Sequence, residues 1–286
     1  MSKFFQRHKV NNLIVFTVVA LTLVFAFPIY KIVRWKMYIW LPDYISQNWH
    51  KSEKVQGIKH IMFIFVDHYE PGTGDKGVKV NREWLANYKA LADKHRDSYG
   101  RKPQHTWFYA YDHHNGGVMS DLSRAVYAGY GEIEFHWHHG HDTNESFKRE
   151  LGEGIKWFNH YGALIDTSGK VSFGFIHGNW ALDNSGEQKH CGVNREMDIL
   201  KKAGCYADFT FPAFGNSSQP SKVNSIYYAL DDDRNKSYDA GMDAKVGVKN
   251  SKDLLIFEGP LSFAEYGAVE LDPYPNQKKM SLSSFS

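Results

Sequence analysis

The stretch EFHWHHGHD, residues 134–142, places four of the chain's 15 histidines within six consecutive positions. The run that contains its beginning, EIEFHWH (132–138), is typical of a β-strand, in which residues two apart point to the same side of the sheet. His136 and His138 should therefore share one face, and His139 should point away. Two imidazoles on one face, with a carboxylate from another strand, form a common ligand set for zinc or another transition metal. The stretch predicts a metal site at a strand end, and a histidine-rich loop with local hydrogen bonds is the alternative.

On both sides of this stretch, short apolar runs alternate with amphipathic ones. The runs that predict strands are 58–66, 105–111, 132–138, 171–177, 205–211 and 253–259, with a further short strand possible at 225–230. Helical spacing or capping predicts helices over 82–95, around 120–129, within 143–162 and over 194–204. Strands that alternate with helices indicate a parallel sheet with crossover helices, and therefore an α/β domain.

Polar residues gather where these predicted strands end. Asp67 and His68 follow the first strand, the group 112–114 follows the second, and His177 ends the fourth. The carboxyl ends of parallel strands lie at one face of an α/β fold, so these side chains should converge. Because strand ends of a barrel surround one point, the pattern favours a barrel over an open sheet. Six visible strands are fewer than a closed eight-stranded barrel needs, so either the barrel is irregular or the chain is incomplete.

Three segments, FVDHYEP (65–71), HWHHGHD (136–142) and HGNWALD (177–183), follow one another in an order that resembles the polysaccharide deacetylase superfamily. The likeness is to a divergent branch with a DHYEP-like first motif, and it covers about residues 57–260. Members of that family are metal-dependent carbohydrate esterases on an irregular (β/α) barrel. The resemblance implies such a barrel here, and removal of N- or O-acetyl groups from a polysaccharide in exopolysaccharide or cell-envelope metabolism.

The resemblance also implies roles for single residues. In the first motif of the family, two acidic residues act as general base and metal ligand, which gives Asp67 the role of base and His68 that of ligand. The late Leu-x-His motif is not found and the Arg-x-Pro-aromatic motif is not evident, so His177 is expected to supply the general acid. Zn²⁺ or another divalent transition metal would polarise the acetyl carbonyl. Tyr69 and Trp180 are expected to stack on sugar rings, although packing is the alternative for each.

The second motif of the family, His-Ser/Thr-x-x-His, is matched less closely. Four residues after His136 stands Gly140, and four after His138 stands Asp142. His136 and His138 are therefore taken as ligands on strand geometry, with His141 or Asp142 as the replacement. The stretch also resembles the His-x-His-x-Asp-His signature of metallo-β-lactamase-like hydrolases, but Gly140 replaces its Asp and the chain alternates strands with helices.

The N-terminal part has a different character. Residues 1–60 carry nine Lys or Arg against two acids, whereas the rest carries 25 against 30, which argues against a nucleic-acid surface. An uncharged run of 18 residues, preceded by Lys3, Arg7 and Lys9, predicts an uncleaved transmembrane anchor, with a cleaved signal peptide as the rival. The predicted organisation is a basic tail, an anchor, an interfacial linker, a barrel domain and a polar tail, at 1–12, 13–30, 31–56, 57–270 and 271–286.

Two further expectations concern compartment and activity. The globular part is expected outside the cytoplasm, where Cys191 and Cys205 could pair, although two unpaired core thiols are an equal alternative. The departures from the family motifs leave a second function open. The chain could be a catalytically weak module, tethered to the membrane, that binds polysaccharide or organises its export.

Overall fold

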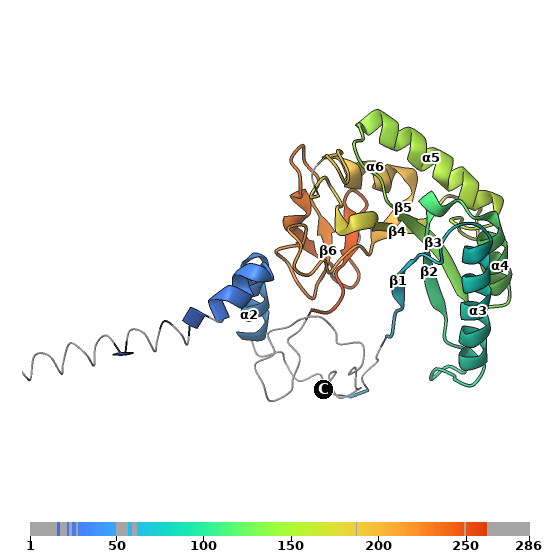
Figure 1. Ribbon diagram of the computed structural model, residues 1–286, viewed down its shortest axis with the longest axis horizontal. Coiled ribbons are helices and arrows are strands. Elements are labelled where there is room, and N and C mark those ends of the chain that lie inside the picture. Colours follow the sequence, from blue (N-terminus) through green and yellow to red (C-terminus); the bar gives the residue numbers. More distant parts are fainter. Residues whose placement is uncertain are drawn as a thin grey trace, which may run out of the picture.

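The computed structural model describes residues 28–49, 62–186, 188–248 and 250–261, together with the single positions 16, 17, 22, 25, 26, 57 and 58. Its centre is one mixed sheet of eight strands in the order β1-β2-β3-β4-β5-β8-β6-β7, with helices packed beside it (Figure 1). The strands are β1 (Val66–Tyr69), β2 (His105–Ala110), β3 (Gly131–Trp137), β4 (Phe173–His177), β5 (Cys205–Asp208), β6 (Ile226–Ala229), β7 (Gly241–Asp243) and β8 (Leu254–Phe257).

The predicted α/β class is confirmed, but the sheet is open. Strands β1 to β5 and β8 run parallel, with each of β1 to β4 paired to the next strand in sequence. Strand β6 then pairs antiparallel with both β8 and β7. The far edge is thus built by an antiparallel pair, not by a parallel strand that could reach β1. The eight strands described do not form the closed ring that the strand ends had indicated.

Four helices flank the sheet: α3 (Gly74–Ala92), α4 (Gly116–Tyr127), α5 (Asn144–His160) and α6 (Glu196–Ala203). Figure 1 shows α3, α4 and α5 together on one side of the strands. The core between them is largely aromatic: Trp107, Phe135 and Phe175 from the strands are buried in one cluster, in which Phe135 packs against Phe158 of α5. Burying one such ring contributes about 1.5–3 kcal/mol, so this layer fixes which face of each strand turns inward.

Local sequence signals set the helix ends. Thr143 caps α5 through a reciprocal capping box with Ser146, which confirms the predicted start of that helix. Gly204 ends α6 with a φ of 108°, a left-handed conformation that glycine adopts without steric cost. The carboxyl ends of β3 and β4 and the start of α6 lie in one region.

The first strand is shorter than predicted. The expected strand covered 58–66, whereas β1 begins at Val66 and the described residues 62–65 are irregular and exposed. Val66 pairs with Thr106, and β2 begins only one residue earlier. Residues before Val66 therefore have almost no partner strand, and apolar character alone does not make a strand there.

The segment before the domain packs against it. It contains the 3₁₀ turn η1 (Met37–Ile39) and helix α2 (Leu41–Trp49). Met37 and Trp40 are buried against Val223 and Leu261, and the Asp43 carboxylate accepts a 2.9 Å hydrogen bond from the Val223 amide. Part of the predicted linker is thus in contact with the globular domain.

Most of the predicted anchor at 13–30 lies outside the described residues, as do the tails at 1–12 and 271–286. Within the part of the chain that the structure describes, no helix combines the length and apolar character needed to cross a bilayer.

Candidate functional site

Strand alternation divides the histidine-rich stretch between two faces of the sheet. His136 pairs with Ile176 and Trp137 pairs with His177, so His136 and His177 point to opposite sides. Two groups of potential metal ligands result. We call His68, Glu70, His136 and His138 the outer cluster, and His139, His177, Cys191 and Glu196 the inner cluster.

In the outer cluster, three donors from β1, the residue after it and β3 converge. The possible ligand atoms of His68, Glu70 and His136 all lie within 4.8 Å of one another. The Nε2 atom of His136 is 3.0 Å from Oε1 of Glu70, and the rings of His68 and His136 are 4.5 Å apart between centroids. Two imidazole nitrogens and a carboxylate oxygen suit zinc and similar divalent cations.

The orientation of the His136 ring is the one expected of a metal ligand. Its Nδ1 lies 3.0 Å from the Ile176 carbonyl oxygen, which only accepts, so Nδ1 carries the donated proton. In the protonated ring Nε2 can donate to the Glu70 carboxylate, whereas in the neutral ring it turns a lone pair toward this carboxylate, which is also an acceptor. A cation bound between Nε2 and the carboxylate would satisfy both acceptors. A hydrogen bond from the other ring nitrogen to a backbone carbonyl, as from Nδ1 here, is usual for metal-binding histidines.

The charge states of the neighbours are compatible with a cation. Burial, aided by His136, lowers the pKa of His68 to about 4, which leaves this imidazole neutral at pH 7. The hydrogen bond with His136 is the main reason why the pKa of Glu70 lies below its ordinary value. No proton has to leave either group before a cation binds near pH 7.

His138 is placed differently from His136, although both lie on the same side. Its Nδ1 is 3.1 Å from Oδ1 of Asp112, and its Nε2 is 3.5 Å from Oε1 of Glu70. The hydrogen bond to Asp112 is the main cause that raises the pKa of His138. Burial opposes ionisation of Asp112, but His138 outweighs it and lowers the pKa of Asp112 to about 2. The pair is an imidazole oriented by a carboxylate, an arrangement suited to proton transfer.

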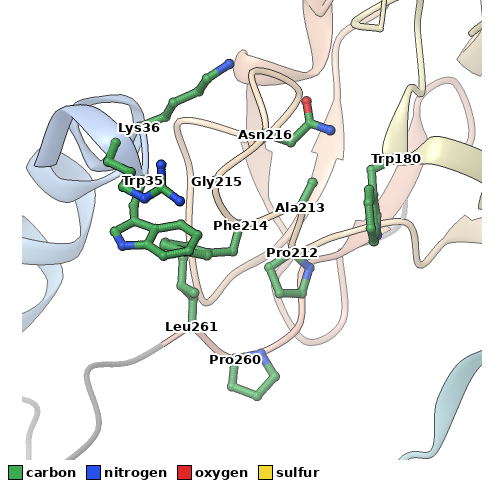
Figure 2. Close-up of a pocket in the computed structure, with 11 residues that line it drawn as sticks. Trp35, Lys36, Trp180, Pro212, Ala213, Phe214, Gly215, Asn216, Pro260 and Leu261 are labelled. Carbon is green, nitrogen blue, oxygen red and sulfur yellow. The ribbon is translucent and has the colours of Figure 1, made fainter. Parts of the chain in front are cut away.

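A cavity lies beside the outer cluster. It has a volume of about 730 Å³, and Figure 2 shows Trp35 and Phe214 at one side of it and Trp180 at the other. The Trp180 ring is also 5.9 Å from that of His68, so one side chain borders both the cavity and the outer cluster. Arg34 and Lys36 add positive charge to the lining.

The inner cluster is enclosed in the protein. His139 follows β3, His177 ends β4, Glu196 begins α6, and Cys191 lies in the loop before α6. Their ligand atoms also lie within 4.8 Å of one another. The residues thus form a group that could hold a metal ion, and the predicted turn of His139 away from His136 is confirmed.

Charge is balanced within the inner cluster. Burial opposes protonation of His139, but hydrogen bonds to Asp142 and Glu196 raise the pKa of His139 to about 9. Burial lowers the pKa of His177 to about 3 and keeps this ring neutral. Burial also disfavours the charged form of Glu196, yet the hydrogen bonds from His139 and Cys191 and the charge of His139 outweigh it and lower the pKa of Glu196.

Three of the expected catalytic or binding residues lie elsewhere. Asp67, expected as the base, is on the opposite side of β1 from His68, and its Oδ2 is 2.9 Å from Nε2 of His105. His177, expected as the acid, belongs to the enclosed inner cluster, because its side chain points to the same side of the sheet as that of its register partner Trp137. Tyr69, expected at the substrate, is buried and donates a 2.7 Å hydrogen bond to Asn81.

Of the remaining expected residues, some meet in the outer cluster and others lie apart from it. His68, His136 and His138 are brought together, and Trp180 borders them. His141, the reserve ligand, is exposed and joins neither cluster, whereas its neighbour Asp142 hydrogen-bonds His139. Cys191 and Cys205 are buried and unpaired.

Sequence reasoning missed Glu70, Cys191 and Glu196 as site residues. Glu70 carried a usable signal, since it stands two positions after His68 and shares its side of the extended chain. Asp112 belongs to the polar group 112–114, for which the sequence leaves open a supporting or substrate-side cluster and a solvated loop. Nothing in the sequence pointed to Cys191 and Glu196, because a loop and a helix start bring them to the strands.

Comparisons of the chain with protein-family models, with curated proteins and with solved structures gave no match.

Proposed function

We propose that this protein is a metal-dependent hydrolase that removes N- or O-acetyl groups from a polysaccharide, with the outer cluster as its active site. One observation carries the proposal. Two imidazoles, a carboxylate and an imidazole–carboxylate pair meet at the carboxyl ends of parallel strands, where all but the buried His136 remain partly exposed beside a cavity. Active sites of α/β folds are usually built at this end of the strands.

His68, His136 and Glu70 would hold the metal ion, Zn²⁺ or another divalent transition metal. When bound, such a cation supplies Lewis-acid polarisation of an acyl carbonyl and makes water more acidic. The Ile176 carbonyl fixes His136 in the tautomer that presents Nε2, so the ring is oriented before any ligand arrives. Replacing His68 or Glu70 removes a donor, whereas replacing Ile176 leaves its backbone carbonyl in place.

His138, supported by Asp112, would carry the proton. Its Nε2 faces Glu70 and therefore the side of the cluster where substrate would lie. The ring can accept a proton from attacking water and return it to the leaving nitrogen or oxygen, while the Asp112 carboxylate stabilises the charged ring. This assignment gives His138 a proton-transfer role in place of the ligand role expected from strand geometry.

The cavity supports a saccharide substrate. Its walls include the flat faces of Trp35, Trp180 and Phe214, and extended apolar faces suit the C–H-bearing side of a sugar ring (Figure 2). Trp180, bordering both the cavity and His68, would place a bound ring next to the metal ligands. Attachment to a membrane through residues 13–30, with the domain outside the cytoplasm, remains part of the proposal.

The test is acetate release by the full-length, zinc-loaded chain from N-acetylated and O-acetylated oligosaccharides. We expect turnover by the parent and background release by His68→Ala. His95→Ala, which changes an exposed histidine beyond the end of α3, is the matched control and should remain active. Metal and oligosaccharide binding without acetate release from any substrate would reject hydrolysis and favour a binding or export-assembly module.

A further inference from the structure

The inner cluster contains a polar atom that the described protein atoms do not satisfy. Nε2 of His177 is buried and has no hydrogen-bond partner, while its Nδ1 contacts the Gly178 carbonyl oxygen. Because a carbonyl only accepts, Nδ1 carries the proton and Nε2 presents a lone pair. That lone pair faces Glu196, whose Oε1 is 3.5 Å away and cannot donate when ionised. A buried acceptor without a partner is costly, which raises the question of what satisfies it.

His139 has the same ring orientation, although its Nε2, unlike that of His177, has a hydrogen-bond partner in Glu196, where a cation would replace the proton. Its Nδ1 lies 2.8 Å from Oδ2 of Asp142, and its Nε2 lies 3.1 Å from Oε1 of Glu196. A carboxylate on one imidazole nitrogen, with the other nitrogen turned to the centre of the cluster, is the usual support of a zinc-binding histidine. Both rings of the cluster thus have Nδ1 held from outside and Nε2 directed inward.

Cys191 and Glu196 complete a mixed donor set. The Cys191 sulfur lies 3.2 Å from Oε2 of Glu196 and accepts hydrogen bonds from the Asn184 and Val193 amides. Those two amides would stabilise a thiolate, the form in which cysteine binds a metal. Two imidazoles, a thiolate and a carboxylate are four ligands, the number found in tetrahedral zinc sites.

We propose that the inner cluster binds one Zn²⁺-class cation as a closed structural site, with His139, His177, Cys191 and Glu196 as its ligands. All four residues are buried, so the protein supplies every ligand and leaves no position for substrate. The proposal goes beyond the hydrolysis assigned to the outer cluster and does not require it.

The site would fix the polypeptide that borders the outer cluster. His177 immediately precedes the turn that carries Trp180, and Cys191 lies in the loop that returns to α6. This loop is also joined to the histidine-rich stretch, since the Asp142 amide donates to the Cys191 carbonyl at 3.0 Å. A cation here ties β3, β4 and α6 together, and so holds Trp180 beside His68.

Cobalt provides a direct test, because only the inner cluster contains sulfur. The full-length chain is loaded with Co²⁺ in place of Zn²⁺, and the near-ultraviolet thiolate-to-cobalt charge-transfer band is recorded. We expect the band in the parent and its complete loss in Cys191→Ala. Cys205→Ala is the matched control, since Cys205 is the other buried, unpaired cysteine and hydrogen-bonds the Ala207 carbonyl away from the inner cluster.

A cobalt-loaded parent without the band would overturn the proposal, whatever the variants do. A band that survives Cys191→Ala would overturn it as well. Should the variants fail to fold, the spectrum of the parent still decides. Acetate release does not enter the readout, so failure of this site and failure of the hydrolase proposal are separate outcomes.

Discussion

The outer and inner clusters use the same chemistry in opposite settings. In the outer cluster, the side chains of His68, Glu70 and His138 are 30%, 37% and 29% exposed, whereas that of His136 is buried. In the inner cluster, those of His139, His177 and Glu196 are 2%, 0% and 0% exposed. The stretch 134–142 contributes residues to both clusters, because alternate residues of β3 and its extension turn to opposite faces of the sheet.

The difference in burial indicates that the outer and inner clusters have different roles. Ligands that are partly exposed beside a cavity can exchange water or substrate, as a catalytic metal requires. Ligands that are wholly enclosed can only hold the chain together. The predictions that follow treat the outer cluster as the place of activity and the inner cluster as the place of stability.

The largest effect is expected at His138. Replacing it with glutamine removes proton transfer and should lower kcat by about 10²–10⁴-fold, while His68, His136 and Glu70 still hold the outer metal. Steady-state kinetics and zinc content, measured on the same preparations, check this. If zinc is lost together with activity, His138 is a ligand and not the proton carrier.

Two glutamates, one in each cluster, should differ in how much they contribute to the free energy of unfolding. Glu196→Gln disturbs a buried network in which this carboxylate accepts from Asp183 N and Cys191, so the unfolding free energy should fall by about 3–5 kcal/mol. Glu70→Gln changes a partly exposed group and should cost less than about 1 kcal/mol. Urea unfolding of both variants gives the comparison, and equal losses would erase the division between the clusters.

A third glutamate, buried away from both clusters, shows what the histidines contribute. Glu258 accepts from Gln219 and interacts with no imidazole of the described residues, and burial raises the pKa of Glu258 from 4.5 to about 9. Between these values the folded state keeps a proton that the unfolded state releases, so stability is lost as pH rises toward 9.

Relative to Glu258→Gln, the unfolding free energy of the parent should therefore decline by at most about 1.4 kcal/mol per pH unit over this range. Urea unfolding at several pH values measures the slope. A difference between the two proteins that does not change with pH would show that Glu258 is ionised.

The smallest expected effect concerns Trp180. Loss of its ring face should raise KM for an oligosaccharide by about 2- to 10-fold, from an aromatic contribution of about 0.5–1.5 kcal/mol. Trp180→Phe keeps a flat face and should recover much of the loss. An unchanged KM for Trp180→Ala would place the substrate away from this side of the cavity.

The sequence predicted the strand-and-helix order well because each element carries its own pattern. Alternation placed His136 and His138 on one face and His139 on the other, and both outcomes depend on the local geometry of β3 and of the extended residues that follow it. Closure of the sheet could not be predicted in this way. It depends on β6 and β7, two short strands whose antiparallel pairing is decided by distant partners.

The misplaced residues have a related cause. Asp67 was assigned from a family motif, but in β1 it adjoins His68 and so must face the other side. His177 was placed at the site because it ends a strand, and its pairing with Trp137 turns it inward. The end of a strand can be predicted from the sequence, and it says at which edge of the sheet a residue lies. Only the register of the strand says to which face of the sheet its side chain points.

The most direct test of two separate metal sites is the release of zinc from the full-length, fully loaded chain to a colorimetric chelator over time. Two equivalents are expected, one released quickly from the outer cluster and one slowly, at the rate at which the protein opens. His68→Ala should remove only the fast phase, and Glu196→Gln only the slow one. A single equivalent, or two that leave together in every variant, would contradict the division of open and closed sites.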